Sequence, residues 1–382
     1  MLFRRKRRQA FVLVFVQGSR MPVDHPMRRQ LHDELHARPS LYFEAPSLVW
    51  HAAFHVGGPS SWVPHTLCGD AELTRDGKSG IAVCGNGQIK WEVHNEFISL
   101  THVMPWSGRL DEMPEPDPAW AEVIGTVQGQ LLVSVEVLVT TGLDDPRILL
   151  PGDGEAIAST VGGGEAEAWS TYRLGENGSI RIVLMNKKLN PYRTGRIVRR
   201  LLEIENYRMM ALLSHPLSQE AFARCADFEK RLQLIVSALG GAERKAEALL
   251  AEIAKLSADI LEFSTKTRVR FAATAAYADL VFARLEELRE TRVEGHQRIG
   301  VFIDRRFRPA VRSCEQADKR IESAAVRVAR ASELLRTSVQ VELEQQNAMM
   351  LNSVAQRVAL QTKLQEAVEG FSIIAISYYL LG

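Results

Sequence analysis

Two histidines near the N-terminus have the spacing of a metal-binding pair. His32 and His36 are four residues apart, so on a helix both imidazoles lie on one face and can share one metal ion. The zinc-protease motif needs glutamate directly after the first histidine, but Asp33 occupies that place, and Pro39 ends any helix soon afterwards. Helix capping and packing is therefore the favoured alternative explanation for this segment.

A third histidine, His94, completes the candidate group. If folding brings it beside His32 and His36, the three side chains form a metal site, and a metal-dependent hydrolase is one hypothesis for the activity. His51 and His55 share the four-residue spacing, but they fall in an expected strand, where about 13 Å separates them. These two are therefore not expected to hold one ion.

Motifs for catalysis or cofactor binding are otherwise missing from the sequence. It contains no Walker-type loop, no dinucleotide-binding glycine pattern and no nucleophile-elbow motif. The glycines at 162–164 are followed by Glu165, whose charge would repel a phosphate group. We therefore predict no catalytic residue and no cofactor, and we expect a protein that is not an enzyme.

Length and composition limit the class of protein. The chain has 382 residues and a net charge of +1, with 46% hydrophobic and 24% charged residues. At about 150 residues per domain, this length predicts two or three units. The near-neutral charge argues against a nucleic-acid partner, and the composition excludes wholesale disorder, collagen and a disulfide scaffold. The four cysteines are widely spaced, so we expect reduced thiols.

Proline and tryptophan are distributed unevenly along the chain. Fourteen of the fifteen prolines lie at or before Pro216, and all six tryptophans lie between Trp50 and Trp169. Because proline breaks helices, its loss marks a change from a turn-rich body to long helices. We expect residues 21–190 to form an α+β domain with a mixed, largely antiparallel sheet, and residues 1–20 to be a disordered or non-native extension.

The second half of the chain has the pattern of long helices. Residues 191–241 are expected to form connecting helices, the first of them capped by Asn190 with Pro191 in its first turn. Residues 242–369 follow as a stalk with coiled-coil spacing and a break over 295–309. Such amphipathic rods bury their apolar side against another helix or another copy of the chain, so we expect a homo-oligomer. The stripe of the last rod consists of Ile321, Ala324, Val328, Ala331, Leu335, Val339, Leu343, Met350, Val354 and Val358.

The final segment, residues 370–382, contains no charged residue. Thirteen residues are too few to cross the hydrocarbon core of a bilayer, which needs about twenty. Two interpretations are therefore open: a C-terminal helix docked on the core, or the first part of a truncated transmembrane helix.

Four segments resemble an uncharacterised bacterial family that often carries the automatic label egg lysin, or sperm-lysin. They are the ELHARP-type run 34–39, the segments 91–97 and 195–209, and 364–372 with the tyrosine pair 378–379. Members of that family look like membrane proteins, so the resemblance implies that a transmembrane helix starts near residue 370. The layout is also similar to that of CorA-type magnesium channels, an analogy of architecture that does not carry function by itself.

The leading hypothesis is a membrane-anchored, non-enzymatic oligomeric protein that acts in CorA-like ion transport or as a scaffold. Its α+β domain and most of the chain would lie in the cytoplasm, at the bacterial inner membrane. The expected partners are the lipid bilayer, reached through the C-terminus, and further copies of the chain, joined through the stalk helices; no nucleic acid is expected. The alternatives are the metal-dependent hydrolase and a soluble coiled-coil scaffold.

Overall fold

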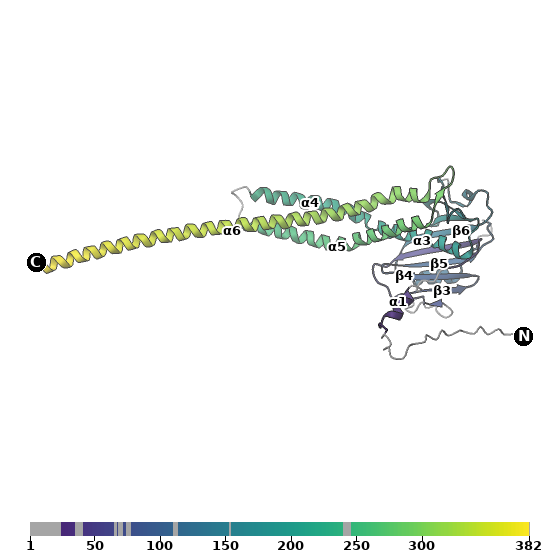
Figure 1. The fold of residues 1–382 in the computed structure, drawn as a ribbon, viewed down its shortest axis with the longest axis horizontal. Helices are drawn as coiled ribbons and strands as arrows, with labels where there is room; N and C mark the ends of the chain where they lie inside the picture. Colours follow the sequence, from purple (N-terminus) through teal and green to yellow (C-terminus); the bar gives the residue numbers. More distant parts are fainter. Residues whose placement is uncertain are drawn as a thin grey trace, which may run out of the picture.

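Strands rich in apolar residues build one large sheet from the front half of the chain. A computed structural model describes residues 24–34, 41–64, 67, 72–73, 78–109, 114–152, 154–239 and 246–381. Ten strands of the described residues form a sheet in the order β10-β7-β8-β9-β6-β1-β5-β4-β3-β2. The sheet lies at one end of the long helices (Figure 1). The predicted extension 1–20 lies outside the described residues.

The sheet is mixed and mostly antiparallel, as predicted for an α+β fold. Each pair of neighbouring strands is antiparallel except β6 and β9, which are parallel. The strands are β1 (Ser47–His55), β2 (Glu72–Leu73), β3 (Ser79–Cys84), β4 (Gly87–Val93), β5 (Phe97–Pro105), β6 (Gln130–Thr140), β7 (Ile157–Val161), β8 (Ala166–Leu174), β9 (Ile180–Asn186) and β10 (Thr291–Arg292).

Both faces of the sheet are covered, because successive residues of each strand point to opposite faces. On one face, Val49 and Ala53 of β1 join a core with α3 (Pro191–Leu212). On the other face, Ala52 and its neighbours pack with α2 (Pro118–Thr126) and several tryptophans. Two further short elements are α1 (Arg28–Glu34) and the 3-10 helix η2 (Pro146–Leu149).

Helix α3 begins where the sequence predicts. The side chain of Asn190 accepts a hydrogen bond from the backbone N–H of Arg193 at 3.0 Å, and Pro191 occupies the first turn. Gly195 lets another part of the chain touch the helix, because a Cβ at this position would lie 1.9 Å from the carbonyl oxygen of Leu41. The segment that begins at Leu41 therefore lies directly against α3.

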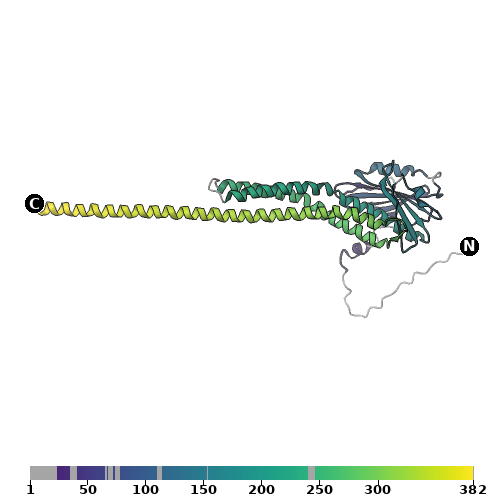
Figure 2. The same ribbon diagram turned by 90° about the horizontal axis from the view of Figure 1, so that it is seen from above.

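Three long helices form a bundle that extends from the sheet domain. Helix α4 (His215–Leu239) leads away from the sheet, α5 (Ala246–Glu287) returns to it, and α6 (Ile299–Leu381) leads away again (Figures 1 and 2). Between α5 and α6 the chain adds β10 to the edge of the sheet beside β7. The bundle core includes Phe228 of α4, Phe263 of α5 and Ile321 of α6.

The expected break over 295–309 is shorter in the structure. Helix α6 already begins at Ile299 and continues through Pro309. Proline inside a helix removes one backbone hydrogen bond and costs about 3 kcal/mol. Buried apolar residues on both sides of it, Ile303, Phe307 and Val311, pack in the core of the sheet domain and hold the helix together.

The apolar run at the C-terminus forms the last turns of α6, and the interpretation as a membrane segment is wrong. No helix among the described residues is both long and apolar enough to cross a membrane. The physical reason is that Lys363, Glu366 and Glu369 precede the run, so any window of about twenty described residues at this end of α6 includes charged side chains. The analogy with CorA-type channels, which depends on membrane helices, loses its support with this finding.

Candidate functional site

The three histidines proposed as metal ligands lie in different surroundings. His32 is exposed on α1, and His36 lies outside the described residues. His94 lies in the turn between β4 and β5, where its ring stacks on Phe97 with centroids 4.1 Å apart. Among the described residues, no group of three or more histidine, cysteine, aspartate or glutamate side chains could hold a metal ion. A site made by His32, His36 and His94 stays a prediction.

A small polar cavity lies next to His94, between the sheet and α3. Its volume is about 40 Å³, which is room for a few water molecules and far below the roughly 300–1,000 Å³ of a site for a small organic ligand. The polar side chains that line it include His51, Lys90, Glu92, Thr101, Arg199 and Asn206.

His51 is the centre of the hydrogen-bond network in this cavity. Its Nε2 lies 2.9 Å from Oδ1 of Asn206 and its Nδ1 lies 2.9 Å from Oγ1 of Thr101. Because an amide oxygen only accepts, Nε2 carries the proton and the Thr101 hydroxyl donates to Nδ1. Burial lowers the pKa of His51 to about 4, partly offset by the hydrogen bond to Asn206, so the imidazole is neutral at pH 7.

Thr101, His51 and Asn206 are arranged like a catalytic triad. Thr101 supplies a hydroxyl, His51 a base, and Asn206 a group that orients the base. Two features of the site speak against catalysis by these residues. A base with a pKa of about 4 is poorly matched to proton abstraction near pH 7. The cavity also has no room for an organic substrate beside the hydroxyl. The network is better explained as polar packing that fixes α3 on strands β1 and β5.

Charged groups complete the wall of the cavity in pairs. Lys90 and Glu92 of β4 form an ion pair at 3.1 Å, and their side chains are only 6% and 21% exposed. Arg199 and Glu203 of α3 lie 3.5 Å apart. The buried Nε of Arg199 has no hydrogen-bond partner within the part of the chain that the structure describes, which makes this group a donor for water in the cavity.

A second buried histidine, His102, lies on the other face of the sheet. Its ring is stacked between Trp50 and Trp120, with centroids 5.4 and 5.6 Å away. Neither ring nitrogen has a hydrogen-bond partner among the described residues. Burial lowers the pKa of His102 to about 4, although the negative charge of Asp117 acts to raise it. His102 therefore behaves as a neutral, flat packing group.

The sequence contained a signal for this cavity that the search for metal ligands missed. His51 and His55 lie too far apart along β1 to bind one metal ion. The hydrogen-bond partners of His51 come instead from β5 and α3. Asn206 lies on α3 among buried apolar residues, beside Leu202 and Met210. A polar residue on the buried face of an amphipathic helix indicates a partner across the packing interface.

A long exposed apolar surface lies on α6 beyond the bundle. Leu335 is the last buried residue of α6, and we call residues 336–381 the projecting segment (Figure 2). Of the predicted stripe, Ile321 to Leu335 is buried in the bundle and Val339 is partly buried against it. The remaining members are exposed, namely Leu343, Met350, Val354 and Val358.

The projecting segment also carries few charges. Its 46 residues contain seven charged side chains, and four of them lie beyond residue 344; the seven are Arg336, Glu342, Glu344, Arg357, Lys363, Glu366 and Glu369. A helix that stays alone in water is usually stabilised by charged pairs on most turns. This segment has the composition of a helix that is covered by another surface.

Comparison with known proteins assigns the chain to a family. The family described as "Protein of unknown function (DUF3422)" matches residues 23–382. The chain belongs to this family. No curated protein and no solved structure matches the chain significantly. The resemblance to the bacterial family with the ELHARP-type run is not tested by these comparisons and stays a prediction.

Proposed function

We propose that this member of the DUF3422 family is a non-enzymatic, self-associating stalk protein. The α+β domain is carried at one end of the bundle of α4, α5 and α6, and the projecting segment joins copies of the chain in a helical assembly. The observation that carries the proposal is the exposed apolar stripe of the projecting segment, from Leu343 to Val358.

The length of the projecting segment supports association. Forty-six residues at about 1.5 Å each extend roughly 69 Å beyond the last buried residue of the bundle. Helix formation in water gains most of its stability from packing of an apolar face, and beyond Val339 this segment has no such packing within the described chain. Burial of each exposed leucine, valine or methionine contributes about 1.5–3 kcal/mol.

The register of the stripe supports a second copy of the chain as the partner. The same side of α6 that packs against α4 and α5 at Ile321 and Val328 continues outward to Met350 and Val354. A second copy presents the same stripe, so two projecting segments can bury each other in a symmetric contact. The few charges of the segment keep repulsion between copies small.

The experiment is a mass measurement of the full chain by light scattering after size exclusion. The wild-type protein is expected at a multiple of 42.7 kDa. The double variant Met350→Glu/Val354→Glu places two charges in the stripe and is expected to be monomeric. The matched control, Asn352→Glu/Gln356→Glu, adds the same charges about 200° around the helix and is expected to keep the assembly.

Two results would overturn the proposal. The first is a wild-type protein that stays monomeric at about 50 µM. This concentration is several-fold above the micromolar dissociation constant of ordinary weak assemblies, so a monomer would show that the stalk does not associate. An assembly that persists in both variants is held by another surface. Far-ultraviolet circular dichroism adds a second readout, because a monomeric stripe variant is expected to lose helix in the projecting segment while the bundle stays folded.

A further inference from the structure

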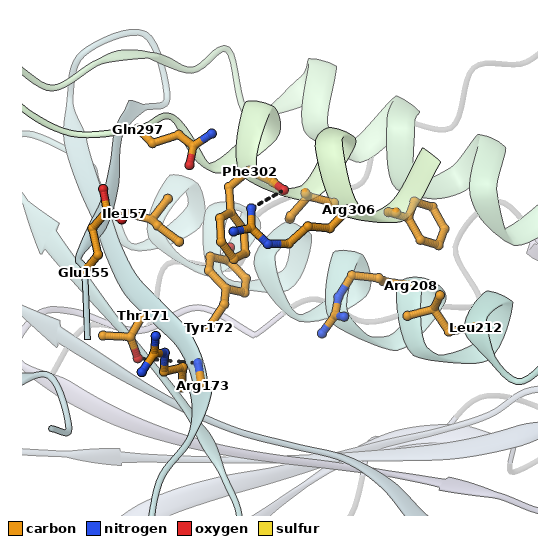
Figure 3. A pocket seen from close by; sticks show the side chains of 12 residues that line it. Glu155, Ile157, Thr171, Tyr172, Arg173, Arg208, Leu212, Gln297, Phe302 and Arg306 are labelled. Atoms are coloured by element: carbon orange, nitrogen blue, oxygen red, sulfur yellow. Dashed lines mark hydrogen bonds between the residues drawn. The ribbon is translucent and has the colours of Figure 1, made fainter. Parts of the chain in front are cut away.

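A second, larger cavity lies where the sheet meets the base of the stalk. Its volume is about 390 Å³, which falls in the range of sites for small organic ligands. Side chains from β7, β8, α3 and the first turns of α6 surround it (Figure 3). It is therefore a cavity between the sheet domain and the stalk, separate from the polar cavity around His51.

Three arginines from three different elements line this cavity. Arg208 of α3 is held by the buried carboxylate of Glu205, with Nη2 2.5 Å from Oε2 and Nε 3.2 Å from Oε1. Arg173 of β8 and Arg306 of α6 have no carboxylate partner among the described residues, and both are exposed to solvent. Glu155 is the single acidic residue of the lining, so the cavity carries a surplus of positive charge.

An unusual backbone conformation gives the cavity its shape. Tyr172 has φ +52°, although it is not glycine, and it lies where the register between β8 and β9 shifts. A non-glycine residue in this conformation is strained, so the surrounding packing must hold it in place. In a regular strand, Tyr172 and Arg173 would point to opposite faces, whereas here both line the cavity (Figure 3).

Aromatic stacking fixes one of the arginines in place. The ring of Tyr172 stacks on Phe302 of α6, with centroids 5.2 Å apart and an angle of 29° between the planes. The guanidinium of Arg306 lies over the Phe302 ring, 3.9 Å from its centroid. Nη1 of Arg306 also donates to the carbonyl oxygen of Phe302 at 3.4 Å (Figure 3). These contacts restrain Arg306 beside the cavity, and its other N–H groups remain available to a ligand.

We propose that this cavity binds a small molecule through an oxyanion, the chemistry that a phosphate ester and a carboxylate share. The guanidinium group of arginine binds such oxyanions through two parallel hydrogen bonds. Arg173 and Arg306, which have no carboxylate partner among the described residues, supply the positive charge. Apolar side chains of Ile157, Leu212 and Ile303 face the carbon skeleton of the ligand. Because Arg173 belongs to the sheet and Arg306 to α6, a bound anion ties the stalk to the sheet domain.

The test is calorimetric titration of the full chain at fixed ionic strength. Pyrophosphate and glycerol phosphate probe the phosphate source and citrate probes the carboxylate source, with chloride as the reference salt. Saturable binding of either class supports the proposal and identifies the source. Arg306→Gln and Arg173→Gln are each expected to weaken that binding about tenfold or more, since each removes charge-assisted hydrogen bonds.

The matched control is Arg305→Gln, which removes the same charge from the neighbouring exposed position of α6 outside the cavity. It is expected to leave the dissociation constant unchanged within about twofold. Thermal unfolding shows that each variant is folded. Absence of saturable binding by all three probes would overturn the proposal, as would an equal loss in the Arg305→Gln control, because that result indicates general charge attraction.

Discussion

The carboxylate of Glu96 lies 3.0 Å from the guanidinium of Arg270, a residue 174 positions later in the sequence. Glu96 belongs to the turn between β4 and β5, and Arg270 to the middle of α5. The Tyr277 hydroxyl donates to the same carboxylate at 3.0 Å, and Arg270 also donates to the carbonyl oxygen of Met210 at 2.9 Å. One carboxylate thereby connects the sheet domain to the returning helix of the stalk.

Replacement of Glu96 by glutamine is expected to destabilise the protein by about 1–3 kcal/mol. The change keeps the shape of the side chain but removes its charge, which leaves the mostly buried Arg270 without its carboxylate. Urea unfolding at pH 7 measures the loss. Glu122→Gln, on the exposed side of α2, is the matched control and is expected to change stability by less than about 0.5 kcal/mol. Equal effects would contradict the connecting role of Glu96.

The buried His51 makes stability depend on pH between about 6.5 and 4. Below its ordinary pKa of 6.5 the unfolded chain takes up a proton at His51, whereas the folded protein does so only near pH 4. The contribution of neutral His51 to the free energy of unfolding is therefore fully present above pH 6.5 and is lost as the pH falls to about 4. Its size is on the order of 3 kcal/mol. Nearby Glu92 opposes the shift, and Lys90 and His94 favour it.

The variant His51→Gln tests this dependence. The free energy of unfolding is measured in urea at pH 7 and pH 4.5, and the difference between the two pH values is expected to be smaller in the variant. His102, which is also buried, continues to contribute in both proteins. The control His25→Gln removes an exposed histidine and should keep the wild-type difference. A difference that is the same in all three proteins would contradict the prediction.

Gly195→Ala is expected to destabilise the protein by about 1–3 kcal/mol. The new Cβ would lie 1.9 Å from the carbonyl oxygen of Leu41, so the segment at Leu41 must move away from α3. Gly125→Ala in α2 is the control, because no atom lies within 4 Å of a Cβ there. That control is expected to gain up to about 1 kcal/mol, since alanine favours the helix. Thermal unfolding of both variants distinguishes a local clash from a general effect of the substitution.

Much of the fold could be predicted from local patterns in the sequence. The α+β architecture, the capped start of α3 at Asn190 and the buried stripe from Ile321 to Leu335 all follow from turn residues and periodicity, and the structure confirms them. Pro309 was misleading, because tertiary packing on both sides of it outweighs the local cost of proline in a helix. The membrane segment, which the family resemblance implied, was wrong, because no helix among the described residues is long and apolar enough to cross a membrane.

The site residues were harder to predict, because their partners come from distant parts of the chain. His51 belongs to a network with Thr101 and Asn206, and no spacing within one element reveals such a group. The cavity at Tyr172 depends on a register shift between β8 and β9, which a sequence pattern does not show. Short motifs indicate sites within one element, whereas the cavities at His51 and at Tyr172 lie between elements.

The outermost strands of the sheet, β2 and β10, have two residues each. A border this short offers a neighbouring molecule very few free backbone groups, so adding a foreign strand gains little. Arg292 in β10 adds a charge that further discourages such stacking. These short outer strands therefore disfavour fibre-like growth through the sheet.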